Sequence, residues 1–455
     1  MNTFDTLNFT WTDFLLLGLI GGIIFTITYL IYPPMIKWLK KQGYIGYDIH
    51  KTDRPATAES GGLGLTIGIL AGSILAIIFF SELWAEILIF DSTIIIAAII
   101  GWYDDRHQLG SLKKIVLMFI TGIPLFVANL LMKEIEIESP TLPILGQLQI
   151  NIIYPLMVPF IIMILTNTVN MLEGYNGEGS GTTSIALLVM VISAIILKSG
   201  EGLVFGIISF AAVFAFFLFN KYPAKAFPGD IGTLVIGAAI GAVGVLGSME
   251  VVMVIVMLPQ VFNSFYVIAS EKGFKESHSV SVQDIWIDKD ELIHASDEKG
   301  AALTLPRLIV VTGALNEKEL VNHFMALSLV SGFLALLSTQ FLAPITEINW
   351  IVFIGISIVS IIGYIILVRR YRRIIMISIV MGVLLGIALL FLLFIDRFIV
   401  DLTNILDVFL GGIIGLVILA IWYGVTLLYF KRTLKKQKMK PDYVSIAERK
   451  QNEQE

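Results

Sequence analysis

Long apolar segments recur along this chain and are separated by short polar ones. Thirteen of them approach or exceed the length that crosses a bilayer as a helix, which is about 20 residues. Their approximate ranges are 14–32, 62–80, 86–102, 115–131, 151–166, 182–197, 203–219, 233–248, 250–269, 324–342, 349–368, 374–395 and 404–430. The sequence therefore predicts an all-α polytopic membrane protein with about 10 core spans and up to three more.

Composition and charge agree with this expectation. Hydrophobic residues make up 56% of the 455 residues, and charged residues only 15%. Of the 31 Lys and Arg residues, 28 fall in loops on one side of the predicted membrane, and the others are Lys133, Lys198 and Arg397. The positive-inside rule then places the N-terminus outside and the C-terminus inside. The chain has no cysteine, which excludes disulfides and thiol catalysis.

The predicted topology divides the chain into four parts. These are a core transmembrane catalytic domain (1–270), a cytoplasmic loop subdomain (271–323), C-terminal spans (324–430) and a basic cytoplasmic tail (431–455). A basic cluster follows the first apolar segment and none precedes it, so we expect a retained helix and not a cleaved signal peptide. The alternating Glu and Ile residues of 134–138 predict a small outside β-hairpin near 132–150.

One polar stretch, Asn167–Gly181, lies between two apolar segments where a brief turn would suffice. Polar groups beside a bilayer usually face water, a ligand or a metal. Its amides and carboxylates are oxygen ligands of the kind that Mg²⁺ uses together with substrate phosphates. For this stretch alone, a solvated turn is the alternative.

Three further polar loops lie on the same predicted side. The first, 47–64, carries Lys51, Arg54 and Glu59 before a Gly-rich helix start, which suits a bound anion. Ordinary basic residues flanking a membrane helix are the alternative there. The second places Asp104 and Asp105 about ten residues before Lys114, and the third holds Asp230 in a Pro-Gly turn, where helix capping is the alternative role.

Together the four loops offer carboxylates, amides, lysines and glycines, without a nucleophilic Ser–His or Cys–His arrangement. Such an inventory is typical of phosphoryl chemistry with Mg²⁺, in which positioning and charge neutralisation do most of the work. The residues themselves therefore predict either a Mg²⁺-dependent enzyme or an anion carrier, with its site facing the cytoplasm.

Six ordered motifs resemble those of the polyprenyl-phosphate N-acetylhexosamine-1-phosphate transferases. They are DIHKTDRPATAESGG, GWYDDRHQLGSLKK, NTVNMLEGYNGEGSG, AFPGDIGTLVIGA, MLPQVFNSFYVIAS and LPRLIVVTGAL, spread over roughly residues 45–320. Their forms are most similar to the UDP-GlcNAc–dolichyl-phosphate GlcNAc-1-phosphotransferase branch. The resemblance implies transfer of GlcNAc-1-phosphate from UDP-GlcNAc to a dolichyl or polyprenyl phosphate with release of UMP. This would be the first step of lipid-linked glycan assembly for N-glycosylation.

The resemblance also implies roles for particular residues. Metal binding, by Mg²⁺ or Mn²⁺ in its place, is implied for Asn170 and Asp230. Catalysis is implied for three residues: Asp104, Asp105 and Lys51, the last near the lipid phosphate. Substrate binding is implied for Lys114 at the pyrophosphate and, around the rest of the donor and acceptor, for Glu59, Gly174, Asn176, Phe227, Asn167, Arg307 and Arg54.

We expect a single displacement in which Asp104 deprotonates or orients the acceptor phosphate; a covalent route through an Asp is the rival. The expected partners are the two substrates, membrane lipids and a second copy in a homodimer, with no nucleic acid. The expected location is a prokaryotic, archaeal-like cell membrane, with the endoplasmic reticulum as the alternative.

Three departures from the family pattern stand out: the six residues before Pro306, GAALTL, contain no cation, Glu173 stands where relatives have Ala or Asp, and 374–430 adds two spans. The alternatives are a sibling transferase for another UDP-HexNAc or polyprenol, and a transporter or flippase of a lipid-linked or anionic solute.

Overall fold

The computed structural model describes residues 10–132, 135, 137–143, 146–148, 150, 153–271, 282–342, 350–398 and 405–439, and side chains in 388–412 and at 111 are excluded. The helices are α2 (Trp11–Lys41), α3 (Gly62–Phe79), α4 (Trp84–His107), α5 (Ser111–Thr121), α6 (Ile123–Leu131), α7 (Ile153–Leu172), α8 (Glu178–Leu197), α9 (Gly200–Asn220), α10 (Gly229–Leu246), α11 (Glu250–Val256), α12 (Leu258–Glu271), α13 (Leu305–Val310), α14 (Glu317–Thr339), α15 (Trp350–Arg370), α16 (Ile375–Phe398) and α17 (Ile405–Lys438). The strands are β1 (Ile45–Tyr47), β2 (Ala56–Ala58), β3 (Thr141–Leu142), β4 (Gly146–Gln147), β5 (Ile285–Ile287), β6 (Leu292–Ala295) and β7 (Leu315–Asn316).

Every predicted apolar segment coincides with a helix or a pair of helices. Within the described residues, 11 helices are long and apolar enough to cross a membrane, or 12 if α11 and α12 form one span. The predicted number of 13 spans is therefore not reached among the described residues. Helix α16 matches the predicted segment 374–395, but the side chains of its later residues are not described. These helices indicate an integral multi-pass membrane protein. The predicted orientation of its ends remains a prediction.

Two predictions about local structure need correction. The segment 250–269 is not one straight span, because α11 and α12 meet at an angle of 66°. Pro259 stands at the start of α12 and has no amide proton to continue α11. The polar stretch Asn167–Gly181 is also mostly helical and not a loop. Asn167 and Asn170 lie in the last turns of α7, and Glu178 begins α8.

The predicted hairpin near 132–150 lies only partly inside the described residues. There the short strands β3 and β4 pair antiparallel, with Thr141 opposite Gln147. Its position outside the membrane remains a prediction.

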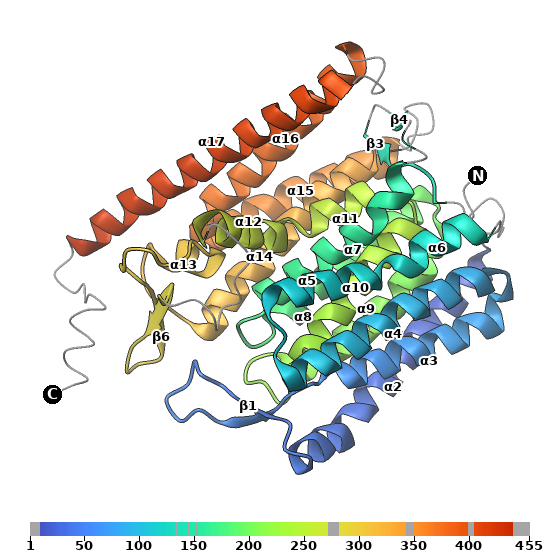
Figure 1. The fold of residues 1–455 in the computed structure, drawn as a ribbon, viewed down its shortest axis with the longest axis horizontal. Coiled ribbons are helices and arrows are strands. Elements are labelled where there is room, and N and C mark those ends of the chain that lie inside the picture. The colour runs from blue at the N-terminus through green and yellow to red at the C-terminus, as the bar shows by residue number, and fades with distance from the viewer. Residues whose placement is uncertain are drawn as a thin grey trace. The chain divides into compact units, whose positions relative to one another are not determined.

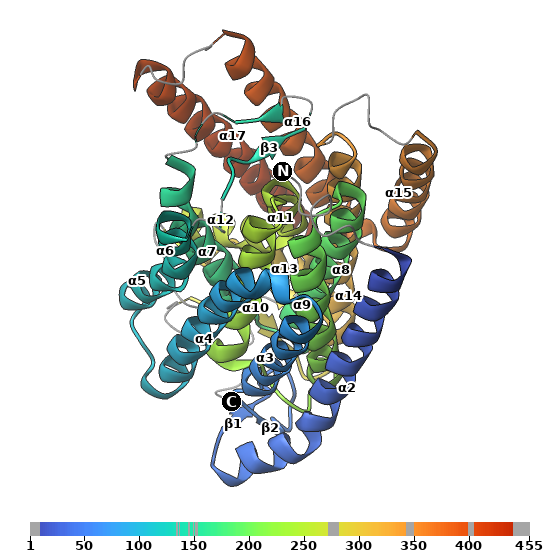
Figure 2. The same cartoon turned by 90° about the vertical axis from the view of Figure 1, so that its right-hand side faces the viewer.

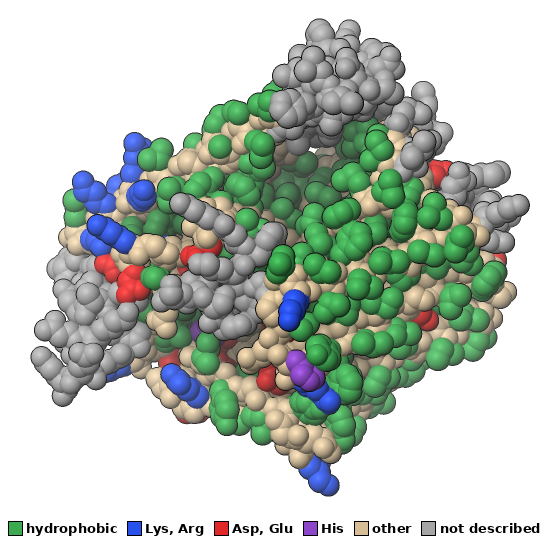
Figure 3. Space-filling model, viewed as in Figure 1, with side chains coloured by type: hydrophobic (Ala, Val, Ile, Leu, Met, Phe, Trp, Pro, Cys, Tyr) green, Lys and Arg blue, Asp and Glu red, His purple; other side chains and the backbone are tan. Residues whose placement is uncertain are grey.

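The chain divides into two units, 1–261 with 328–364, and 262–327 with 365–455. In the first unit α10 is the central helix. It contacts α3, α4, α7, α8 and α9, and 83% of its residues are buried. In both views α2 lies beside α3 and α9 (Figures 1 and 2). Hydrophobic side chains cover much of the surface over α4 and α6, as a bilayer requires (Figure 3).

Small side chains let α10 approach its neighbours closely. A methyl group at Gly101 of α4 would lie 2.6 Å from the backbone nitrogen of Ile231 in α10. This contact lies one turn before Asp104 and beside Asp230, so the packing of α4 on α10 sets the distance between the two acidic segments.

In the second unit, β5, β6 and β7 form an antiparallel sheet, with Trp286 opposite His294. Trp422 of α17 stacks on Phe265 of α12 at a centroid distance of 4.1 Å. The Trp422 indole also donates a hydrogen bond to the Tyr266 hydroxyl. Aromatic packing thus holds α17 on α12 within this unit.

Candidate active site

Four predicted site residues from four helices meet at one end of the first unit. Lys114 Nζ of α5 lies 2.7 Å from Asp104 Oδ2 of α4 and 2.6 Å from Asp230 Oδ1 of α10. Asn170 Nδ2 of α7 donates to the same oxygen of Asp230 at 2.6 Å. Asp104 and Lys114 are only 2% and 4% exposed. A buried lysine is therefore shared by two carboxylates, which keeps its charge compensated.

Asp105 holds the start of α10 in place. Its Oδ1 accepts a hydrogen bond from the backbone N–H of Asp230 at 2.6 Å, and its Oδ2 accepts one from the Ser60 hydroxyl at 2.7 Å. A carboxylate at a helix N-terminus is favoured by the unpaired amides and by the helix dipole. The preceding Gly229 has φ +65°, and a methyl group there would lie 2.6 Å from Asp105 Oδ2. The turn before Asp230 thus requires glycine.

The arrangement around Asp230 fits a divalent cation. The Asn170 amide and the Asp230 carboxylate are close enough to bind one ion together. Rotation of the amide by half a turn would direct its oxygen, in place of its nitrogen, toward the carboxylate. Thr233 Oγ1 also lies 2.9 Å from Asn170 Nδ2 and adds a further oxygen. An oxygen-only donor set suits Mg²⁺ or Mn²⁺.

A second group of side chains surrounds Asp48, for which the sequence predicted no role. Lys51 forms an ion pair with Asp48 Oδ2, and the Asn176 amide donates to the same oxygen at 2.8 Å. Burial raises the pKa of Asp48, but these hydrogen bonds lower the pKa by more, so the net shift is downward. Asp48 thus connects the loop that precedes α3 to the loop that precedes α8.

Two rings extend this group. The His50 ring stacks on the Tyr175 ring at 4.5 Å, and burial lowers the pKa of His50 to about 4, so the imidazole is neutral near pH 7. The Lys51 ammonium lies 4.4 Å from the centre of the Tyr222 ring. The predicted lipid-phosphate residue, Lys51, is therefore held by a carboxylate and an aromatic face.

Glu59 and Phe227 both lie close to Gly46 in β1. A methyl group at Gly46 would lie 2.9 Å from the Phe227 ring and 3.4 Å from Glu59 Oε2. The backbone of Phe227 is fixed by hydrogen bonds to Ala58 O and from Gly61 N, both 2.8 Å long. Burial raises the pKa of Glu59, and the charge of Asp230 raises it further. An aromatic face and a carboxyl group are thus presented together next to the acidic residues.

Other predicted substrate-binding residues have different surroundings. The Gly174 N–H donates to Glu178 Oε2 at 3.1 Å, and the Asn167 amide donates to Met163 O within α7 at 2.8 Å. Arg54 is exposed on a turn with positive φ. Their predicted contacts with substrate remain predictions.

Arg307 belongs to the second unit and is 5% exposed. Its guanidinium donates to the backbone oxygens of Ser296, Ala301 and Ala302 and lies 4.6 Å from the Phe430 ring centre. These contacts organise the loop before α13, and this supports a structural role. The substrate contact implied for Arg307 remains a prediction.

Known proteins with similar sequences indicate the family of this chain. The model of glycosyl transferase family 4 matches residues 84–248, which include the acidic residues and α10. The chain is 35% identical over 245 residues, 52% of its length and 74% of the relative, to a protein of Saccharolobus solfataricus. It is 30% identical over 332 residues, 70% of its length and 96% of the relative, to a protein of Sulfolobus acidocaldarius. Both carry the provisional name UDP-N-acetylglucosamine–dolichyl-phosphate N-acetylglucosaminephosphotransferase.

A more distant similarity extends to bacteria. A phospho-N-acetylmuramoyl-pentapeptide-transferase of Streptococcus uberis is 27% identical over 277 residues, which cover 57% of this chain and 82% of that protein. The names of all three relatives describe transferases of a phosphorylated N-acetyl sugar. From its matched segment, its relatives and its convergent acidic residues, the chain belongs to glycosyl transferase family 4 as a membrane-embedded phosphoglycosyl transferase.

Proposed function

We propose that this protein transfers GlcNAc-1-phosphate from UDP-GlcNAc to a dolichyl or polyprenyl phosphate and releases UMP. The observation that carries the proposal is the convergence of Asp104, Lys114, Asn170 and Asp230, each within 2.7 Å of a partner. The names of the two archaeal relatives support the choice of donor and acceptor. The product is the lipid diphosphate sugar from which a glycan for protein N-glycosylation is built.

The chemistry is a displacement at phosphorus. An oxygen of the lipid phosphate forms a bond to the β-phosphorus of UDP-GlcNAc, and the bond from this phosphorus to the bridging oxygen breaks. UMP takes the bridging oxygen and its electron pair. Lys114 would stabilise the negative charge that develops on the phosphate oxygens. Its ammonium lies between the Asp104 and Asp230 carboxylates in the buried cluster, which supports this role.

Asp104 acts mainly by orienting Lys114 in this proposal. Its Oδ1 accepts a hydrogen bond from Leu109 N at 2.7 Å, and its Oδ2 faces the Lys114 ammonium. A phosphate monoester has a second pKa of about 6, so the acceptor is largely ionised near pH 7. A strong base is therefore unnecessary. Asp105 acts through α10, because both of its oxygens are used to hold Ser60 and Asp230.

Asn170 and Asp230 would bind a Mg²⁺ ion, with Mn²⁺ as a substitute. When bound, the ion would neutralise charge on the diphosphate and polarise its phosphoryl oxygens. Glu59 and Phe227 would bind the nucleoside, with the ring of Phe227 as a stacking surface. Lys51 would meet the incoming lipid phosphate, and Arg54 would add positive charge at the entrance.

We place this site at the cytoplasmic side of an archaeal-type cell membrane, because the positive-inside rule assigns the loops that carry these residues to that side.

The test is a reaction with purified protein, UDP-GlcNAc, dolichyl phosphate and Mg²⁺, in which UMP and lipid-linked GlcNAc are measured. We expect both products in equal amounts, and none after chelation of the divalent ion. UMP release with another UDP-HexNAc or another polyprenyl phosphate alone would identify the sibling transferase instead. No UMP with any such pair would contradict the transferase.

A further inference from the structure

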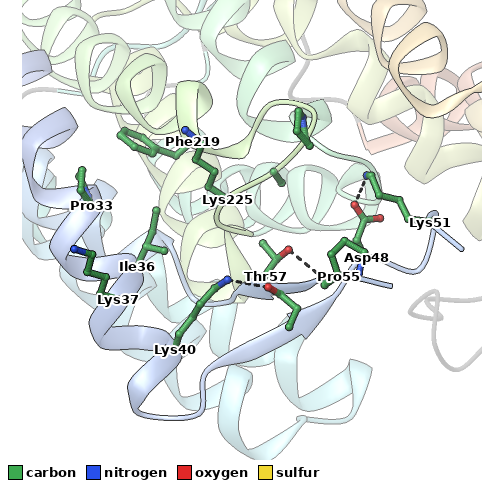
Figure 4. A pocket seen from close by; sticks show the side chains of 13 residues that line it. Pro33, Ile36, Lys37, Lys40, Asp48, Lys51, Pro55, Thr57, Phe219 and Lys225 are labelled. Carbon is green, nitrogen blue, oxygen red and sulfur yellow. Dashed lines mark hydrogen bonds and ion pairs between the residues drawn. The ribbon is translucent and has the colours of Figure 1, made fainter. Parts of the chain in front are cut away.

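A pocket of about 480 Å³ lies at the lysine-rich end of α2, outside the acidic cluster. It is bounded by the last turns of α2, by the β1–β2 connection and β2, and by the segment 219–225 at the end of α9 (Figure 4). Its walls combine lysines with apolar groups: Pro33, Ile36, Phe219 and Pro223. All of these segments belong to the first unit. Of its four lysines only Lys51 has a role in the proposed reaction, which leaves Lys37, Lys40 and Lys225 without one.

The pocket carries an excess of positive charge. Four lysines line it, namely Lys37, Lys40, Lys51 and Lys225, against one carboxylate, Asp48, so three positive charges are in excess. Asp48 is already compensated by Lys51 and by the Asn176 amide. The Lys40 ammonium donates to Ala56 O at 2.8 Å, which fixes it across the pocket. The charge of this pocket therefore suits a phosphate group.

The surroundings favour a phosphate attached to a lipid. The apolar part of α2 is largely uncovered: only 22% of the residues in its most apolar stretch are buried, and Leu30, one turn from Pro33, is 63% exposed. Trp38, between Lys37 and Lys40, is 47% exposed. Tryptophan and lysine at the end of an exposed apolar helix are typical of the headgroup level of a bilayer. A free phosphate would gain nothing from Ile36, Phe219 or the face of α2.

We propose that this pocket binds the headgroup of an anionic phospholipid from the surrounding membrane, with the acyl or isoprenoid chains lying along α2. The lipid phosphate lies among Lys37, Lys40 and Lys225, and its glycerol contacts Ile36 and Phe219. The ligand is a constitutive membrane lipid and not the acceptor substrate, because the acidic cluster that serves the reaction is formed by α4, α5, α7 and α10, none of which lines the pocket. Lys51, which would meet the acceptor phosphate, is paired with Asp48 at the end of the pocket away from Lys37 and Lys40 (Figure 4).

The test measures lipid retention by native mass spectrometry of the full-length protein, titrated with phosphatidylglycerol, phosphatidylcholine or inorganic phosphate. We expect the wild type to retain phosphatidylglycerol selectively. The double variant Lys37→Gln/Lys225→Gln should bind it about tenfold more weakly. Inorganic phosphate at the same concentration should compete little, because it lacks the chains that lie along α2.

The matched control is Lys41→Gln/Lys221→Gln. These two lysines are exposed, come from the same two segments and remove the same charge, but they do not line the pocket. An equal loss of binding in both double variants would show general attraction to a basic surface and would overturn the proposal. So would equal retention of phosphatidylcholine and phosphatidylglycerol by the wild type, or strong competition by inorganic phosphate.

Activity in nanodiscs of phosphatidylcholine separates this lipid from the acceptor. Both double variants should show the same KM for the polyprenyl phosphate as the wild type there. A raised KM in Lys37→Gln/Lys225→Gln alone would assign the pocket to the acceptor and contradict the proposal. The binding measurement is independent of the transferase reaction, so its result stands even if the proposed substrates are wrong.

Discussion

Lys114 Nζ and Asp230 Oδ1 lie 2.6 Å apart although 116 residues separate them along the chain. The contact brings α5 to the N-terminal turn of α10, and Asp104 holds the other side of the same ammonium. In a phosphotransferase, this arrangement keeps the lysine charged and oriented before the substrate arrives. The diphosphate can then replace carboxylate contacts with its own oxygens.

Removal of either predicted metal ligand should abolish turnover. Asp230→Ala and Asn170→Ala are each expected to lower kcat by at least about 100-fold, because the diphosphate charge is no longer neutralised. UMP release at saturating Mg²⁺ and UDP-GlcNAc measures the effect. Thr233→Val removes only the neighbouring hydroxyl and serves as the milder comparison. Near-normal rates in Asp230→Ala or Asn170→Ala would contradict the metal assignment.

Loss of the Lys114 charge should weaken binding of the donor. In Lys114→Ala the affinity for UDP-GlcNAc is expected to fall about tenfold or more, the usual effect of losing a charge-assisted hydrogen bond. Isothermal titration with UDP-GlcNAc in the presence of Mg²⁺ is the measurement. Lys113→Ala is the matched control, because Lys113 is exposed on the same helix. Unchanged affinity in Lys114→Ala would remove this residue from the pyrophosphate site.

The sequence was sufficient to predict that this cluster forms, because the chemistry of its residues is visible in the motifs. Asp104, Asn170 and Asp230 each end or begin an apolar segment on the same predicted side, so their convergence follows from topology. The division of labour between the two adjacent aspartates was not predictable. It depends on which carboxylate faces the α10 amides, and only the packing of α4 on α10 decides this.

Other features had weak or no sequence signals. The bend between α11 and α12 interrupts a continuous apolar run, and Pro259 was the available signal. Asp48 precedes Lys51 by three residues, a spacing that permits their ion pair, but its bond to Asn176 joins residues 128 positions apart. Likewise, the carbonyl oxygens that surround Arg307 come from the backbone, which carries no residue signature.

Neutralising Asp104 should impair catalysis more than folding. Asp104→Asn retains an acceptor for Leu109 N but removes the negative charge next to Lys114. We expect kcat to fall about tenfold or more, while the unfolding temperature changes little, since Asp230 still compensates the Lys114 charge and a buried amide fits the same space. Parallel assays of UMP release and thermal unfolding separate the two effects. A variant that mainly unfolds early would show that Asp104 is structural.

The pH dependence of stability should report on Glu173. Burial raises the pKa of this carboxyl group to about 8, against the lowering effect of the Gly179 N–H. Glu173 is thus protonated in the folded protein at pH 6 but ionised in the unfolded chain, where the pKa of its carboxyl group has the ordinary value of 4.5. Its contribution to stability is complete below pH 4.5 and is lost as the pH rises through about 8.

Thermal unfolding between pH 5 and pH 9 tests this expectation. The wild type should lose stability toward pH 9, by at most about 5 kcal/mol from this group, because each pH unit between the two pKa values is worth about 1.4 kcal/mol. Glu173→Gln cannot ionise and should flatten the profile. Glu138→Gln, on the other side of the predicted membrane, is the control. Parallel profiles for Glu173→Gln and the wild type would exclude this role.

The close approach of α4 to α10 should be as important as the acidic residues it carries. In Gly101→Ala the new methyl group would lie 2.6 Å from Ile231 N and 2.8 Å from the carbonyl carbon of Asp230, so the helices must move apart. Such overpacking typically costs about 1–3 kcal/mol. The displacement also shifts Asp104 and Asp105 relative to Asp230, and we expect a loss of both thermal stability and kcat.

Gly18→Ala in α2 is the matched control, because a methyl group at Gly18 would meet no atom within 4 Å. Since alanine favours helix over glycine by about 1 kcal/mol, Gly18→Ala should be neutral or slightly stabilising. Equal behaviour of the two variants would mean that the distance between α4 and α10 does not control the site.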